Sequence, residues 1–175
     1  MVKSVIRLLV GGTLVFSLHA APFDKVQISA DRKRDEAERA KAVGEGEISK
    51  AFEKVVYNVT LKNTTFEDLS SLKVDYLIFV ERQRVGQKRD QENEGRITGT
   101  DTIAALPRQG SETLTTKEIR LNHSNVTGGW YYANGGRTKA EDSVVGVWIR
   151  VSQGDQLIGE YLSPPTVKNR GWDKK

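Results

Sequence analysis

The sequence of 175 residues has no cysteine, one methionine, two histidines and few aromatic residues. Without cysteine there is no disulfide framework and no thiolate metal site. His19 lies in the first twenty residues, so His123 is the sole imidazole of the remainder. The sequence also lacks a G-x-S-x-G nucleophile elbow and an H-E-x-x-H zinc motif. These absences remove the commonest hydrolase and metal-site patterns, and we predict that the protein is not an enzyme.

Outside residues 1–20, the chain also lacks an excess of one sign of charge. The chain has 27 Lys and Arg against 23 Asp and Glu, and the 27 fall to 25 without Lys3 and Arg7. Nucleic-acid binding depends on a clustered excess of cations and on counterion release. The near balance therefore predicts no nucleic-acid partner. Roughly 155 residues remain beyond the segment, enough for one domain with an ordinary hydrophobic core.

Residues 1–20, MVKSVIRLLVGGTLVFSLHA, have the layout of a secretory signal peptide. Lys3 and Arg7 precede an apolar run from Leu8 to Leu18, and Ala20 is a small residue at the expected cleavage point. The run is shorter than the ~20 residues of a membrane-spanning helix, so a retained anchor is the less favoured alternative. We predict a protein that is periplasmic, associated with the outer membrane or extracellular, and that contacts the membrane only transiently through its signal peptide.

Residues 21–50 combine a short strand with a highly charged stretch. Val26 and Ile28 alternate with polar residues, which predicts a first strand. Residues 31–50, DRKRDEAERAKAVGEGEISK, then mix both signs of charge and contain almost no large apolar side chain. Alanine among Glu and Arg favours a helix, but GEGE interrupts it. The sequence therefore predicts a charged linker or a short solvated helix here.

Residues 51–165 show a hydrophobic period of two, which is typical of β-strands. Residues 52–63 alternate regularly. Residues 72–81 alternate too, but their second face is also partly apolar, which predicts a strand at the centre of its sheet. Residues 99–106 and 111–121 are expected to form a pair of shorter strands around the turn PRQG.

The clearest hairpin is predicted where SVVGVWIRVS and QLIGEYLS flank QGDQ, at residues 143–163. Trp148 is expected on one face of its strand. The other face is expected to carry Val145, Val147, Ile149 and Val151. The pair of prolines that follows stops the sheet, and residues 166–175 are expected to form a basic tail with a lone Trp172.

Six or seven strands with turn residues between them, and no amphipathic helix of core-building length, predict an all-β protein. We expect an antiparallel immunoglobulin-like β-sandwich, of the general kind seen in fibronectin type III domains, with a charged N-terminal segment. A closed barrel is the alternative, because strand count alone does not distinguish the two.

Three stretches together resemble small exported immunoglobulin-like proteins of bacterial envelopes, some of which are encoded beside type IV pilus assembly components. The stretches are VVYNVTLKNTTFEDLSSLKVDYLIFVER, GGWYYANGGRT, and VVGVWIRV followed by LIGEYLSP. The resemblance covers about residues 52–164. It implies a non-catalytic envelope protein that serves as a pilus accessory or as a surface interaction module.

The first candidate binding loop lies within HSNVTGGWYYANGGRT and consists of Trp130, Tyr131, Tyr132, Asn134 and Arg137. Glycine pairs on both sides permit tight turns, and alternate rings of a short extended segment share a side. Rings that face inward would make the loop a lid over one end of the sandwich. Rings that face outward would make a patch for a sugar or a protein. Large aromatic side chains are more often buried, so the lid is the favoured interpretation.

A second candidate is a basic hairpin within ERQRVGQKRD, made by Arg82, Arg84, Lys88 and Arg89. Arg82 and Arg84 share one face of an extended chain. These cations could contact lipid head groups, acidic polysaccharide or nucleic acid. Acidic residues follow at once, however, so a solubilising surface is the simpler interpretation.

Residues 90–101, DQENEGRITGTD, partly match a calcium-binding loop. The matching positions are Asp90, Glu92, Glu94, Gly95, Ile97 and Asp101. Glutamate at the third and fifth positions, aspartate at the twelfth and flanking strands all weaken the match. A charged hairpin tip that protects a sheet edge explains the same residues. We therefore predict no calcium and no other cofactor.

These patterns together predict an exported, non-catalytic β-sandwich of the cell envelope that binds another envelope or extracellular protein, or a glycan. One alternative is a secreted carbohydrate-binding or glycan-hydrolysing protein, and hydrolysis would require two carboxylates about 5 to 10 Å apart beside an aromatic floor. The other alternative is a calcium-dependent adhesion module.

Overall fold

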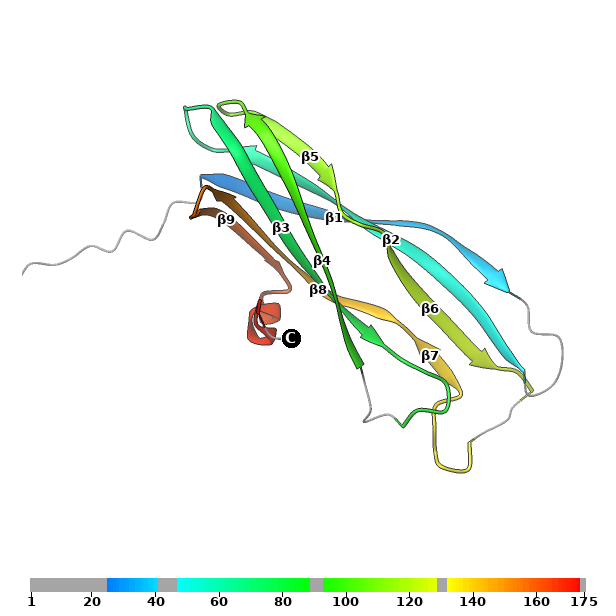
Figure 1. The fold of residues 1–175 in the computed structure, drawn as a ribbon. Coiled ribbons are helices and arrows are strands. Elements are labelled where there is room, and N and C mark those ends of the chain that lie inside the picture. The colour runs from blue at the N-terminus through cyan, green and yellow to red at the C-terminus, as the bar shows by residue number, and fades with distance from the viewer. Residues whose placement is uncertain (1–24, 41–46, 89–92, 129–131, 174–175) are drawn as a thin grey trace, which may run out of the picture.

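The structure is a computed structural model that describes residues 25–40, 47–88, 93–128 and 132–173. The described residues form two antiparallel β-sheets that pack against each other (Figure 1). One, here called the β2 sheet, has the order β1-β2-β6-β7, with β5 also paired to β2; the other, the β3 sheet, has the order β4-β3-β8-β9. The elements are β1 (Val26–Ala40), β2 (Ile48–Asn63), β3 (Leu69–Arg82), β4 (Asn93–Leu106), β5 (Ser111–Thr115), β6 (Ile119–Val126), β7 (Lys139–Glu141), β8 (Ser143–Gln153), β9 (Gln156–Ser163) and the 3-10 helix η1 (Pro165–Arg170). The all-β prediction is confirmed.

The main core lies between the two sheets and follows from the period of two. Alternate residues of β2 and β3 face each other across it, and their aliphatic and tyrosine side chains are almost wholly removed from water. From β2 these are Val55, Tyr57, Val59 and Leu61, and from β3 they are Leu72, Val74, Tyr76, Ile78 and Val80. The predicted central position of residues 72–81 is also confirmed, because β3 lies between β4 and β8.

A second apolar cluster covers the opposite face of the β3 sheet. It contains Leu77, Phe79, Trp148 and Val167. Trp172 packs edge-on against Trp148, with ring centroids 5.3 Å apart. Residues 166–173, predicted to be a basic tail with a lone tryptophan, include most of η1 and pack on this face. They dock on this face because its apolar side chains would otherwise be exposed to water.

The charged stretch at the N-terminus is an edge strand. β1 pairs with β2 along its whole length, so the linker or short helix predicted from residue 31 is wrong as far as residue 40; residues 41–46 lie outside the described part. Glu53 on β2 lies 3.5 Å from Arg32 and 3.2 Å from Arg34. Backbone pairing and these cross-strand contacts outweigh a local helix preference, which is worth only tenths of a kcal/mol per residue.

The predicted pair of strands around PRQG is also wrong. The turn itself is present, because the Gly110 N–H donates to the Pro107 carbonyl at 2.9 Å. It carries the chain from one sheet to the other, however, so that β4 pairs with β3 and β5 pairs with β2. Residues 111–121 are also divided between two strands. The Tyr57 N–H donates to the Thr116 side-chain oxygen at 3.0 Å, between the parts of β2 that pair with β5 and with β6.

The predicted hairpin of β8 and β9 is confirmed, with one difference. Val147, Ile149 and Val151 face the main core and Trp148 faces the second cluster, but Val145 packs with Trp148. The register between β3 and β8 shifts at Phe79 and Val80. An extra residue in one strand reverses the faces beyond it, because side chains alternate strictly. Across the described ranges, no helix is long and apolar enough to cross a membrane.

Candidate functional site

The structure brings the two candidate surfaces of the sequence together. The Gly86 N–H donates to the Arg137 carbonyl at 2.8 Å, and the Arg137 N–H donates to the Gln87 carbonyl at 3.0 Å. The approach is close, since a Cβ atom on Gly136 would lie 2.4 Å from the Gly86 carbonyl oxygen. The basic loop (residues 83–88) and the aromatic loop (residues 132–138) therefore form one continuous surface.

The residues of the aromatic loop have different roles. Tyr132 is half-buried, and its ring lies over Gly86. The Asn134 side-chain oxygen accepts the Gly136 N–H at 2.9 Å, which stabilises the turn. Trp130 and Tyr131 lie outside the described residues, so the lid and patch interpretations of these rings stay predictions.

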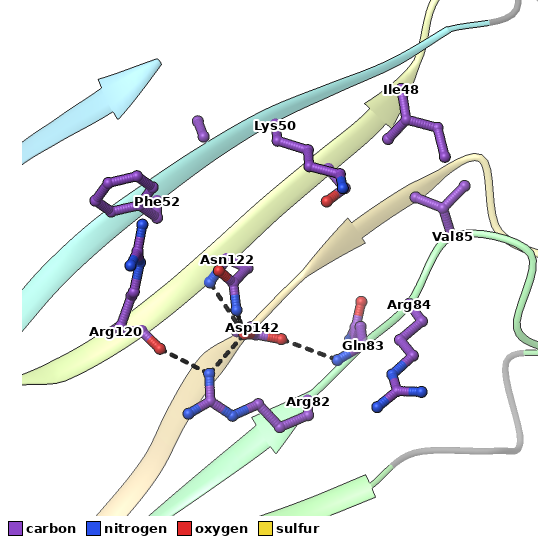
Figure 2. Close-up of a pocket in the computed structure, with 12 residues that line it drawn as sticks. Ile48, Lys50, Phe52, Arg82, Gln83, Arg84, Val85, Arg120, Asn122 and Asp142 are labelled. Carbon is purple, nitrogen blue, oxygen red and sulfur yellow. Dashed lines mark hydrogen bonds and ion pairs between the residues drawn. The ribbon is translucent and has the colours of Figure 1, made fainter. Parts of the chain in front are cut away.

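A groove of about 870 Å³ adjoins the basic loop (Figure 2). Its floor is the face of β2 and β6 that points away from the core, because the floor residues alternate with core residues such as Val55, Ile119 and Leu121. Two strands and one loop supply most of the lining. From β2 come Ile48, Lys50 and Phe52, from β6 come Arg120, Asn122 and Ser124, and from the end of β3 and the basic loop come Arg82, Gln83, Arg84 and Val85.

Asp142, between β7 and β8, is a buried carboxylate in the groove. Its Oδ2 accepts hydrogen bonds from the Arg82 guanidinium at 2.7 Å and from the backbone and side chain of Asn122, both at 3.0 Å. Its Oδ1 accepts the Gln83 N–H at 3.0 Å. Burial alone raises the pKa of Asp142, but these hydrogen bonds outweigh burial and hold the pKa below the ordinary value of 3.8. Asp142 is therefore a fixed anion at neutral pH.

Arg82 is engaged within the protein. Besides Asp142, its guanidinium donates to the Arg120 carbonyl at 2.7 Å, so it joins the end of β3 to β6 (Figure 2). Arg84 and Lys88 are exposed, and Arg89 lies outside the described residues. The cations of the predicted basic hairpin thus divide into one that holds the groove together and two that face solvent.

Three cationic side chains in the groove remain available to a ligand. Lys50, Arg84 and Arg120 are exposed, and none forms an ion pair with the residues that the structure describes. The Arg120 guanidinium lies 3.5 Å from the centroid of the Phe52 ring, a cation–π contact that leaves its N–H donors accessible. Asp142 is the one carboxylate in the described lining, and Arg82 already compensates it. The groove is therefore positively charged with an apolar component.

The opposite face of the same strands carries an ion-pair cluster centred on Glu53. Its carboxylate lies near Arg32 and Arg34 of β1, and 3.8 Å from the His123 Nε2 of β6. His123 is the sole imidazole of the chain outside residues 1–20. The structure places it within β6, where it joins three strands through Glu53.

The calcium-loop template of residues 90–101 is an extended strand where the structure describes it. Glu94, Gly95, Ile97 and Asp101 all lie on the extended strand β4, while residues 90 and 92 are outside the described part. At about 3.3 Å per residue, Glu94 and Asp101 are separated by roughly 23 Å and cannot wrap one cation. Within the described ranges, no group of three or more potential ligands is placed to hold a metal.

Sequence reasoning missed the groove floor. Ile48, Lys50 and Phe52 occupy the polar face of β2, and residues 48–50 were assigned to a charged linker rather than to a strand. The available signal was an exposed isoleucine and a phenylalanine at alternate positions around a lysine. Apolar side chains on the solvent face of a strand are a recognised sign of a binding surface.

Comparisons with known proteins show limited similarity. No protein-family profile matches the sequence, and no curated protein matches it. E. coli curli protein CsgC is 14% identical, with 80% of this chain and 99% of that chain covered and a TM-score of 0.30. A protein from Akkermansia muciniphila is 11% identical, with 90% and 82% covered and a TM-score of 0.32. Northeast Structural Genomics Consortium target SoR45 is 10% identical, with 78% and 93% covered and a TM-score of 0.36. These values are too low to transfer a function.

Proposed function

We propose that this chain is an exported, non-catalytic protein of the cell envelope that binds another envelope or extracellular protein through the groove and the two adjoining loops. An immunoglobulin-like topology and a pilus-associated role, which the sequence resemblance implies, are the finer form of this proposal. The observation that carries it is the coexistence of Lys50, Arg84 and Arg120 with exposed apolar surface in one groove.

Electrostatics supports binding of an anionic partner. Three like charges around one groove repel each other, and the single described carboxylate of the lining is already paired with Arg82. An acidic partner relieves this repulsion and is steered toward the groove before contact. Arginine and aromatic side chains are also the residue types that contribute most to binding at interfaces.

The chemistry of the groove favours binding over catalysis. A general acid needs a pKa raised toward neutrality, whereas hydrogen bonds keep the pKa of Asp142 low. A glycan hydrolase needs a second carboxylate beside the first, and the described lining supplies no other. His123 belongs to the Glu53 cluster on the other face of the strands.

The test is capture of partners from an envelope extract by the immobilised protein. We expect the double variant Lys50→Glu and Arg84→Glu to lose the partners that the unaltered protein retains. Lys62→Glu is the matched control, because Lys62 is an exposed lysine on the same face of β2 at its other end. Equal capture by all three proteins would contradict a binding role for the groove.

Export has an independent test. Intact-mass analysis of the protein from its native host is expected to show a chain that begins near Ala21. A mature pool that retains residues 1–20 would contradict cleavage and would favour the retained anchor.

A further inference from the structure

We infer that the groove binds an extended peptide segment with apolar, acidic and apolar residues at alternate positions on one face. This inference rests on the proposed function and specifies the partner's chemistry. It follows from the order of side chains along the groove floor, which is apolar, basic and apolar at Ile48, Lys50 and Phe52.

The spacing of these floor residues selects an extended ligand. Alternate residues of a strand are about 6.6 Å apart, and alternate residues of an extended ligand have the same spacing. Contacts therefore stay in register over several residues. A helical ligand, with 3.6 residues per turn and a rise of 1.5 Å per residue, does not match this period.

The wall at the Ile48 end reinforces this order. At one end, Val85 and Ile48 point toward each other and offer an apolar site (Figure 2). Ile48 is 41% exposed, and a ligand that covers it removes this apolar surface from water. At the other end, Phe52 carries the Arg120 guanidinium on its ring.

The centre of the groove is complementary to an acidic side chain of the ligand. Lys50 pairs across the ladder with neutral Ser124, and Arg84 lines the facing wall. Charge-assisted hydrogen bonds from these donors to a carboxylate are roughly twice as strong as neutral ones. The ligand's acidic residue therefore belongs between its two apolar residues.

The pattern ends after Phe52. The next residue on the same face is Lys54, which lies 3.4 Å from the Glu118 carboxylate and is already compensated. Asn122, opposite Phe52, is held by Asp142. The floor thus recognises about three alternate positions, which correspond to a segment of about five residues.

The experiment measures fluorescence anisotropy of a labelled peptide with the core Leu-Thr-Glu-Thr-Phe between Gly-Ser flanks, titrated with the purified protein. One comparison peptide has Gln in place of Glu. The other, Leu-Glu-Thr-Thr-Phe, has the same composition but places the acid on the opposite face. We expect each comparison peptide to bind at least about tenfold more weakly, because each loses the central charge pair.

Protein variants provide the reciprocal test. Lys50→Glu and Arg84→Glu are each expected to weaken binding of the Leu-Thr-Glu-Thr-Phe peptide by at least about tenfold, while the affinity of Lys62→Glu for this peptide stays within about twofold of the unaltered protein. If either Glu variant has a lowered melting temperature, the corresponding Lys50→Gln or Arg84→Gln variant is used in its place. Loss of affinity in well-folded Gln variants supports the inference equally.

Several results would overturn it. Equal binding of the two isomeric peptides would exclude recognition of alternate positions on one face. Equal binding of the Glu and Gln peptides would exclude recognition of an acidic residue. Binding to phosphatidylglycerol vesicles that is abolished by Lys50→Glu, without peptide binding, would assign the groove to a lipid surface. Absence of peptide binding together with groove-dependent protein capture from extract would reject this inference and leave the proposed function standing.

Discussion

Asn63 and Asp142 are buried polar side chains at opposite ends of β3, and they organise those ends differently. Asn63 donates to the carbonyls of Glu67, Leu106 and Pro107 at 2.8 to 3.2 Å and accepts the Thr65 N–H at 2.9 Å. It is neutral, and apart from the Thr65 hydroxyl, which donates to its Oδ1 at 2.8 Å, its partners are backbone groups. Asp142 is charged, requires Arg82, and lies in the groove beside three further cations.

The two ends meet the same requirement, that buried polar groups have hydrogen-bond partners, but one stays neutral and the other becomes charged. Both ends of the sandwich must satisfy buried polar groups, because an unsatisfied one costs about 1 to 3 kcal/mol. A neutral amide does this without changing the local charge. A carboxylate does so only with cations nearby, which leaves a charged surface. The Asn63 end is therefore suited to stability, and the Asp142 end carries the charged surface on which the proposed binding role rests.

The largest expected effect is a difference in stability loss between a core residue and a groove residue of the same strand, β2. Leu61 is fully buried in the core at the Asn63 end, whereas Phe52 lies in the groove on the opposite face of β2. We expect Leu61→Ala to lower the free energy of unfolding by about 2 to 5 kcal/mol and Phe52→Ala to lower it by about 1 kcal/mol. Urea denaturation of both variants measures this, and equal losses would show that the groove floor is part of the core.

The next effect is expected at Asn63. Replacement by alanine leaves three carbonyls and the Thr65 N–H without their side-chain partner, and we expect a loss of about 2 to 3 kcal/mol. The loss should be the same at pH 7 and pH 4, because an amide does not titrate. A loss that changes over this interval would show that the Asn63 end is coupled to a titrating group.

A smaller effect that depends on pH is expected at Asp142. We expect Asp142→Asn to cost about 1 to 2 kcal/mol at pH 7, since the amide keeps part of the hydrogen bonding and Arg82 is partly screened by solvent. The folded pKa lies below the unfolded one, so the carboxylate's stabilisation is present above about pH 4 and is lost as the pH falls through the folded pKa.

The stability of Asp142→Asn should therefore fall less steeply below pH 4 than that of the unaltered protein. Part of the slope should remain, because hydrogen bonds from Thr100 and Lys73 also outweigh burial and lower the pKa of Asp75. Denaturation at a series of pH values measures both slopes. Identical slopes in the two proteins would contradict the assigned pKa of Asp142.

The smallest effect is expected outside both ends, at the C-terminal segment. Trp172 packs on Trp148, and the Arg150 guanidinium lies 4.6 and 4.4 Å from the two ring centroids. We expect Trp172→Ala to cost about 1 kcal/mol and Trp172→Phe to cost less, because phenylalanine keeps an aromatic edge. Thermal unfolding of the two variants tests this. No loss in Trp172→Ala would show that docking of the segment adds no stability.

Much of the fold was predictable because strand formation leaves a local pattern. The alternation in residues 52–63, the two apolar faces of residues 72–81 and the final hairpin were all recognised correctly. Errors arose where pairing depended on distant residues. Beyond residue 30, β1 has no local strand pattern and is held extended by its ladder to β2, and β5 joins β2 rather than the strand next to it in sequence.

The site was predictable only in fragments. The basic and aromatic loops were identified separately, but their contact through Gly86 and Arg137 joins segments that are far apart in sequence. Lys50 and Phe52 were missed because a lysine at the end of a charged stretch and a phenylalanine at the start of a strand have no significance until β6 and the basic loop surround them.

The sequence by itself determined the alternation that builds the core and the supply of cations, because each depends on residues that are close along the chain. Only the tertiary structure decided which cations remain available. Arg82 is compensated by Asp142 and Lys54 lies beside Glu118, while Lys50 and Arg84 have no such partner among the described residues. Electrostatic compensation depends on distance in space, and the fold alone sets that distance.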